Sequence, residues 1–140
     1  MFGLKKKPRK DDEIVKDWES LLDLLIGVGG GKAQKDGSVR FEVPFKKEKR
    51  KAEVFVHCAE VDGIGAVVYF TAPFAYPASP ENCAQSLDMV EKILEGGIVV
   101  SADSLAVRTT KPMECMSYKD AAQLIERLSV TADEFAKEFS

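Results

Sequence analysis

The chain has few of the residue types from which metal sites and most hydrolytic active sites are built. Among its 140 residues there are one histidine, three cysteines and one tryptophan. Cys58, Cys83 and Cys115 are far apart in the sequence and form no CxxC pair, so neither a zinc site nor a disulfide framework is indicated. We interpret the three cysteines as reduced, small apolar side chains.

Long apolar segments are also missing. A membrane helix needs roughly 18 apolar residues in succession, whereas the apolar stretch Leu21–Val28 is interrupted by Asp23 and ends in glycines. The basic beginning, Met1–Lys7, is not followed by the apolar region that a secretory signal requires. We therefore expect a cytoplasmic protein without a membrane span.

Positive and negative charges are unevenly distributed along the chain. Residues 1–51 carry 14 of the 20 Lys and Arg but 9 of the 23 Asp and Glu, a net charge of +5, and residues 52–140 carry a net charge of −8. With 45% hydrophobic and 31% charged residues, the chain can bury a core as one domain of ordinary size. We expect a flexible basic tail over residues 1–10 and a single domain over residues 11–140.

The clearest structural signal is a hairpin within Arg50–Ala75. Two runs rich in β-branched and aromatic residues flank the turn Asp62–Gly65. Alternation predicts that Phe55 and His57 point to one face, and that Val54 and Val56 point to the other. Because both faces carry apolar residues, helices on one side would leave an apolar face that typically meets a partner.

Three more strands are predicted around this hairpin. They cover Ser38–Phe45, Ile98–Ala102 and Leu105–Thr110, and the last two form a second hairpin around Asp103-Ser104. Since the connections within each run of strands are short, the sheet should be antiparallel.

Apolar residues at helical spacing predict three helices. The first is capped by Asp11 or Asp12 and runs to Ile26, the second begins at Ser79-Pro80, and the third begins at the capping sequence from Ser117 to Asp120. The expected fold is therefore α+β, with five antiparallel strands and three helices in the order α-βββ-α-ββ-α. The predicted apolar stripes are Ile14, Trp18, Leu21, Leu22 and Leu25; Cys83, Leu87, Val90 and Leu94; and Ala121, Leu124, Ile125, Leu128, Ala132, Phe135 and Phe139.

This order of elements resembles the type III secretion chaperone-like fold and, within it, the YbjN-like proteins. The resemblance is carried by the stripe of Trp18–Leu25, the hairpin Val54–Phe70, the segment Pro80–Leu94 with Asn82, and the hairpin that feeds the last helix. Secretion chaperones of this fold are homodimers that bind extended segments of effector proteins without ATP and without catalysis. The resemblance thus implies a homodimeric, chaperone-like protein that needs no cofactor.

Two patterns that suggest chemistry are better explained structurally. The glycines in residues 27–31 lack the spacing of a phosphate-binding loop, because Ile26 and Ala33 stand where Gly and Ser or Thr are needed. His57 and Cys58 are neighbours in a strand, so their side chains point to opposite faces and cannot form a dyad. We therefore expect no enzymatic activity, no metal and no cofactor.

The preferred hypothesis is a non-catalytic module that binds a protein client or a second copy of itself. The residues predicted at that contact are Met89, Ile93, Leu105 and Val107. The alternative is a nucleic-acid or anion-binding regulator that uses the basic first third of the chain. Its predicted basic patch is Lys46, Lys47, Lys49, Arg50 and Lys51.

Overall fold

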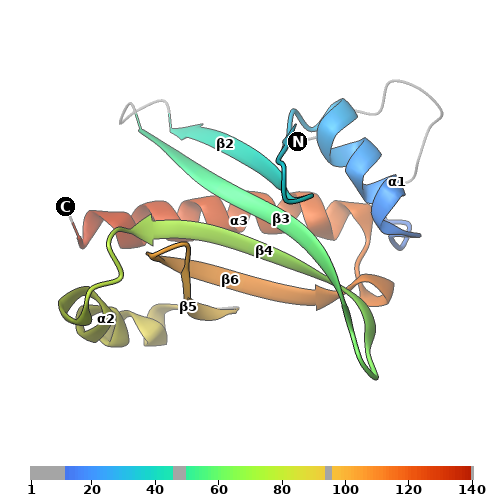
Figure 1. Ribbon diagram of the computed structural model, residues 1–140. Helices are drawn as coiled ribbons and strands as arrows, with labels where there is room; N and C mark the ends of the chain where they lie inside the picture. The colour runs from blue at the N-terminus through green and yellow to red at the C-terminus, as the bar shows by residue number, and fades with distance from the viewer. Residues whose placement is uncertain (1–11, 46–49, 94–95, 140) are drawn as a thin grey trace.

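The computed structural model describes residues 12–45, 50–93 and 96–139 of the chain, and the predicted tail over residues 1–10 lies outside them. Its centre is a six-stranded antiparallel sheet with the strand order β1-β2-β3-β4-β6-β5 (Figure 1). The α+β class and the antiparallel sheet are therefore confirmed. The strands are β1 (Lys32–Ala33), β2 (Val39–Phe45), β3 (Arg50–Val61), β4 (Gly65–Ala75), β5 (Gly97–Ser101) and β6 (Ser104–Pro112).

The expected number of five strands is wrong, because the glycine-rich loop contains the additional strand β1. Its two residues pair with the beginning of β2, Lys32 opposite Arg40 and Ala33 opposite Val39. A segment of two residues is too short to show alternation of apolar and polar side chains. Only the pairing with β2 makes it a strand.

The central hairpin has the predicted faces. Val56 of β3 lies opposite Phe70 of β4, and His57 lies opposite Tyr69. Val56 and Phe70 are fully buried, whereas His57 and Tyr69 are half-buried. Directly opposite residues share a face in an antiparallel pair, so these two pairs mark the core side and the outer side of the hairpin.

Two helix beginnings are confirmed by their caps. In α2 (Pro80–Ser86), the side chain of Ser79 accepts a hydrogen bond from the backbone N–H of Asn82 at 3.1 Å. In α3 (Tyr118–Lys137), the Ser117 hydroxyl accepts from the Asp120 N–H, and the Asp120 carboxylate accepts from the Ser117 N–H, both at 3.0 Å. These side chains pair backbone donors that have no partner within the helix.

The first helix is shorter than expected. It comprises α1 (Trp18–Leu22) and the π-helical segment η1 (Asp23–Val28), and Asp17 caps it instead of Asp11 or Asp12. Ile14 is not part of its apolar stripe, since the backbone of Ile14 pairs with Ser117 and its side chain is 52% exposed. Pairing with a distant segment thus overrides the local helical pattern.

The second helix is also interrupted. After Ser86 the chain tightens into the 3₁₀ segment η2 (Leu87–Lys92). In a 3₁₀ helix every third side chain points the same way. Met89 is therefore buried, while Leu87 and Val90 of the predicted stripe are 70% and 48% exposed; Leu94 lies outside the described residues.

The helices and the sheet form two layers. In Figure 1, α3 passes behind β3 and β4, and its apolar stripe packs against the side of the sheet that carries Val54, Val56 and Phe70. Leu21, Leu24 and Leu25 of α1 and η1 join the same core, as does Met89 of η2. The core cluster takes its strand residues from this side of the sheet only. The short segment η3 (Met113–Cys115) connects β6 to α3.

Candidate functional site

The side of the sheet opposite the core is the candidate functional site, and we call it the open face. It consists of residues 53, 55, 57 and 59 of β3, residues 67, 69, 71 and 73 of β4 and residues 106, 108 and 110 of β6, with Arg40 and Glu42 of β2 and Val99 of β5. No helix of the described ranges packs on the open face. In Figure 1 this face points toward the viewer, because α3 lies behind the sheet.

The open face is neither a bare polar surface nor a closed core. Phe55, Tyr69 and Val99 are half-buried. On the same face, Val67, Thr71 and Ala106 are 3%, 2% and 0% exposed. A continuous surface of partly exposed aromatic and apolar groups is typical of a place where another molecule packs.

Three planar groups form a row across the middle of the open face, which we call the stack. The rings of His57 and Tyr69 are stacked, with 4.7 Å between their centroids and 5° between their planes. The guanidinium carbon of Arg108 lies over the Tyr69 ring, 5.4 Å from its centroid. Arg108 is further held by Nε, which donates to Thr71 Oγ1 at 2.9 Å. The stack is therefore a rigid feature that spans β3, β4 and β6.

The electrostatics of the stack are set mainly by Arg108. Partial burial and the positive charge of Arg108 lower the pKa of His57, and the negative charge of Asp36, the smallest of the three effects, opposes this. His57 is therefore neutral at pH 7. No carboxylate pairs with Arg108 within the part of the chain that the structure describes.

The cations at the β2 end of the face are compensated, in contrast to Arg108. Arg40 forms ion pairs with Glu53 and with Glu42, the second at 3.3 Å. Lys51 Nζ lies 2.6 Å from the same Glu42 carboxylate. These pairs raise the pKa of Arg40 and lower the pKa of Glu42, so these two groups stay ionised at neutral pH.

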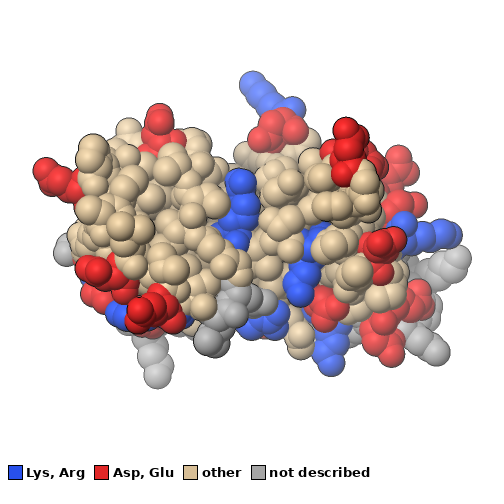
Figure 2. Space-filling model, turned by 90° about the horizontal axis from the view of Figure 1, so that it is seen from below, with Lys and Arg blue, Asp and Glu red and all other residues tan. Residues whose placement is uncertain are grey.

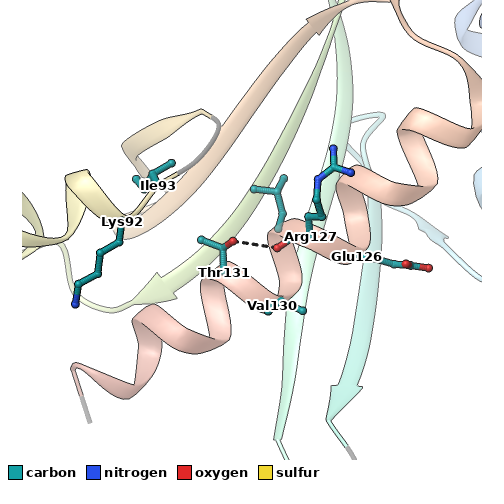
Figure 3. A pocket seen from close by; sticks show the side chains of 7 residues that line it. Lys92, Ile93, Glu126, Arg127, Val130 and Thr131 are labelled. Carbon is teal, nitrogen blue, oxygen red and sulfur yellow. Dashed lines mark hydrogen bonds between the residues drawn. The ribbon is translucent and has the colours of Figure 1, made fainter.

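A hollow lies on the helical side of the molecule, between η2 and α3. Its volume is about 450 Å³, and Lys92 and Ile93 line one wall while Val130 and Thr131 line the other (Figure 3). The Thr131 hydroxyl donates to the Arg127 carbonyl at 3.0 Å. In the view from below, some basic side chains lie in the depression between the two halves of the molecule and others lie at its edge, and acidic side chains lie mainly toward the edges (Figure 2).

The contact residues predicted from the sequence do not lie on the open face. Met89, Leu105 and Val107 are 3%, 2% and 0% exposed and belong to the core of the protomer. Only Ile93 is half-buried, at the wall of the hollow beside α3. A partner could reach the first three only if the core opened, so we move the candidate contact surface to the open face.

The predicted basic patch is only partly visible. Lys46, Lys47 and Lys49 lie outside the described residues, while Arg50 begins β3 and Lys51 follows it. Lys51 is paired with Glu42, as described above. Lys51, the one patch residue whose side chain the structure describes, is thus part of a charge pair at the end of a strand.

His57 and Cys58 point to opposite sides of the sheet, as the alternation predicted. His57 stacks on Tyr69 at the open face, whereas Cys58 packs against the core, where burial raises the pKa of its thiol. In the described ranges, no three His, Cys, Asp or Glu side chains gather as metal ligands would. The helices of these ranges include none with the length and apolarity that crossing a membrane requires.

Arg108 and Tyr69 were not singled out by the sequence. The hairpin turn could have placed Tyr69 opposite His57, because short turns determine the register of the strands. Placing Arg108 beside them requires the pairing of β4 with β6, which joins segments that are distant in sequence. Neither protein-family models nor curated proteins give a match to the sequence.

Proposed function

We propose that this protein is a non-catalytic, chaperone-like binding module of the cytoplasm that holds a segment of a partner polypeptide against the open face. The observation that carries the proposal is the asymmetry of the sheet. One side holds the complete core, while the other leaves Phe55, Tyr69 and Val99 half-buried with no helix over them in the described ranges. Contact with a polypeptide would remove this apolar surface from water, which is the main source of favourable free energy in association.

The composition of the open face suits a polypeptide better than a small metabolite. A small ligand is typically held in a concave pocket that buries most of its surface. The described hollows lie on the helical side and beside α3 at the ends of β3 and β4, whereas the stack lies on an extended surface formed by three neighbouring strands. A second copy of the chain is the other polypeptide that this surface could receive, as the resemblance to dimeric chaperones implies.

Site-specific photocrosslinking in the native host tests the proposal. A photoreactive phenylalanine analogue at position 55 would place the reactive group on the open face. The matched control places the same group at Leu87 of η2, a 70% exposed apolar side chain that is not part of the open face. We expect a discrete crosslinked polypeptide from position 55 and none from position 87.

The outcome distinguishes the two kinds of partner. A product with twice the mass of the chain, whose peptides all come from this protein, identifies a second copy as the occupant. A product that contains another protein identifies a client. If positions 55 and 87 give the same pattern, the open face is not a specific contact surface and the proposal fails.

A further inference from the structure

Arg108 is a half-buried cation in the interior of the sheet, since β6 lies between β4 and β5. Its Nε is used by Thr71, and its guanidinium lies over the Tyr69 ring. The two terminal amino groups have no carboxylate partner in the described part of the chain. A guanidinium offers donors in a fixed fork that matches a carboxylate, so Arg108 is held ready for one.

The surroundings of Arg108 leave its outer side accessible. The residue directly opposite it on β5 is Gly97, which has no side chain. Its neighbours on the same face of β6 are Ala106 and Thr110, both small. Among the described residues, the positions that flank Arg108 on β5 and β6 therefore carry small side chains or none, which leaves room for a side chain from another molecule.

From this geometry we infer that Arg108 receives an aspartate or glutamate side chain of the bound polypeptide, which makes the open face selective for acidic segments. The inference rests on the function proposed above and names the chemistry of its partner. The half-buried Phe55 of β3 and Val99 of β5, on the same face, would receive apolar side chains of the same segment.

A nucleic acid suits the open face less well. Such partners are bound by several cations that contact successive phosphates, whereas Arg40 and Lys51 already pair with Glu42 and Glu53. Bases commonly stack on free aromatic faces, but the Tyr69 ring is covered by His57 on one side and by Arg108 on the other. Arg108, a cation without a carboxylate partner among the described residues, lies beside partly exposed apolar groups, and this combination favours an acidic polypeptide.

Selection of random peptides displayed on phage, with the full-length protein as the target, tests the inference. Parallel selections use the wild type and Arg108→Gln, which removes the charge but keeps a polar side chain of similar reach. We expect Asp and Glu to be enriched only in peptides selected on the wild type. A synthetic peptide from that pool should bind Arg108→Gln about 10- to 100-fold more weakly in calorimetry, the loss expected for a hydrogen bond between charged groups.

Two further variants control for charge and folding. Lys119→Gln makes the same change of net charge at an exposed position of α3 and should leave the affinity unchanged. Arg108→Lys keeps the charge without the planar fork and should bind with intermediate affinity. If Arg108→Gln does not fold, as judged by circular dichroism, the comparison of Arg108→Lys with the wild type decides.

Each other result overturns the inference in a recognisable way. If the affinity of the selected peptides is unchanged by Arg108→Gln but falls with Phe55→Ser, the carboxylate contact is refuted and the proposed function stands. If neither substitution changes the affinity of the peptides, or if no peptide is selected, both the carboxylate contact and the proposed function are refuted. Binding of single-stranded oligothymidylate that depends on Arg108 would assign the cation to phosphate. A dimer in sedimentation equilibrium that Arg108→Gln dissociates would make a second copy the occupant.

Discussion

The imidazole ring of His57 lies parallel to the phenol ring of Tyr69, with 4.7 Å between the ring centroids. The two residues are direct cross-strand partners in the hairpin of β3 and β4. The guanidinium of Arg108 lies over the same Tyr69 ring. His57, the only histidine of the sequence, therefore has an aromatic neighbour and a positive charge nearby. Both partial burial and this charge disfavour the protonated imidazolium.

The first prediction is that His57 makes the protein less stable as the pH falls below neutrality. The pKa of His57 is lower in the folded chain than its ordinary value of 6.5. Between the two pKa values the unfolded chain binds more protons, so the free energy of unfolding rises with pH. The stability is complete above about pH 6.5 and decreases as the pH falls toward the folded-state value.

Urea unfolding at several pH values between about 5 and 7.5, above the ordinary range of carboxylates, measures this effect. His57→Phe keeps a ring against Tyr69 but does not titrate. We expect the free energy of unfolding of the wild type to decrease over this range more than that of the variant. Parallel curves for the two proteins would show that His57 has the same pKa in both states.

The second prediction concerns the reciprocal cap of α3. The Ser117 hydroxyl accepts from the Asp120 N–H at 3.0 Å, and Ser117→Ala leaves this donor without its partner. We expect the free energy of unfolding to fall by about 1 kcal/mol, within the range of roughly 0.5–2 kcal/mol for lost N-caps. Lys119→Ala, at an exposed position in the same helical turn, should change it by less than about 0.5 kcal/mol. Equal effects of the two substitutions in urea unfolding would contradict a role for the cap.

Local rules were sufficient where neighbouring residues determine the structure. The alternation in β3 and β4 predicted that Phe55 and His57 share a face, and the structure confirms it. The caps at Ser79 and Ser117 were equally readable, because each side chain bonds to a backbone N–H three residues later. The existence of an outer apolar face followed from the same patterns, although its chemistry did not.

Distant contacts determined what the sequence did not reveal. The backbone N–H of Val15 donates to the Met116 carbonyl at 2.8 Å, which keeps this segment extended in place of the predicted helix. Arg108 reaches the stack only through pairing between β4 and β6, and a register irregularity between Pro73 and Ala75 lies within that pairing. Such contacts join parts of the chain whose spacing in sequence carries no periodic signal.

The third prediction separates the inward and outward sides of η2. Met89 is 3% exposed in the core, whereas Leu87 is 70% exposed. Met89→Ala should lower the free energy of unfolding by about 2–5 kcal/mol, because it removes buried apolar atoms and leaves a cavity. Leu87→Ala should change it by less than about 0.5 kcal/mol. If the α-helical spacing of Cys83, Leu87 and Val90 described the segment instead, urea unfolding would show the larger loss for Leu87.

The fourth prediction concerns the close approach of the chain between η1 and β1 to the first full strand. A Cβ atom added to Gly31 would meet the Val39 side chain, Phe41 Cζ at 2.8 Å and the Leu25 carbonyl oxygen at 2.9 Å. Val39 and Phe41 are core residues of β2, and the Gly31 N–H also donates to Leu25 at 2.8 Å. Glycine is therefore required here by space, not by a left-handed backbone.

Gly31→Ala should lower the free energy of unfolding by about 1–3 kcal/mol, the usual cost of overpacking a core. Gly27→Ala is the matched control, because a Cβ there meets nothing within 4 Å, and removing a glycine from a helical segment gains up to about 1 kcal/mol. Trp18, the single tryptophan, lies in α1 and packs partly buried against the core, so its fluorescence reports the docking of this segment. A red-shifted emission in Gly31→Ala alone would mean that the segment has moved from β2. Equal stability and equal emission in both variants would mean that the side chains of Val39 and Phe41 move aside without lowering the free energy of unfolding.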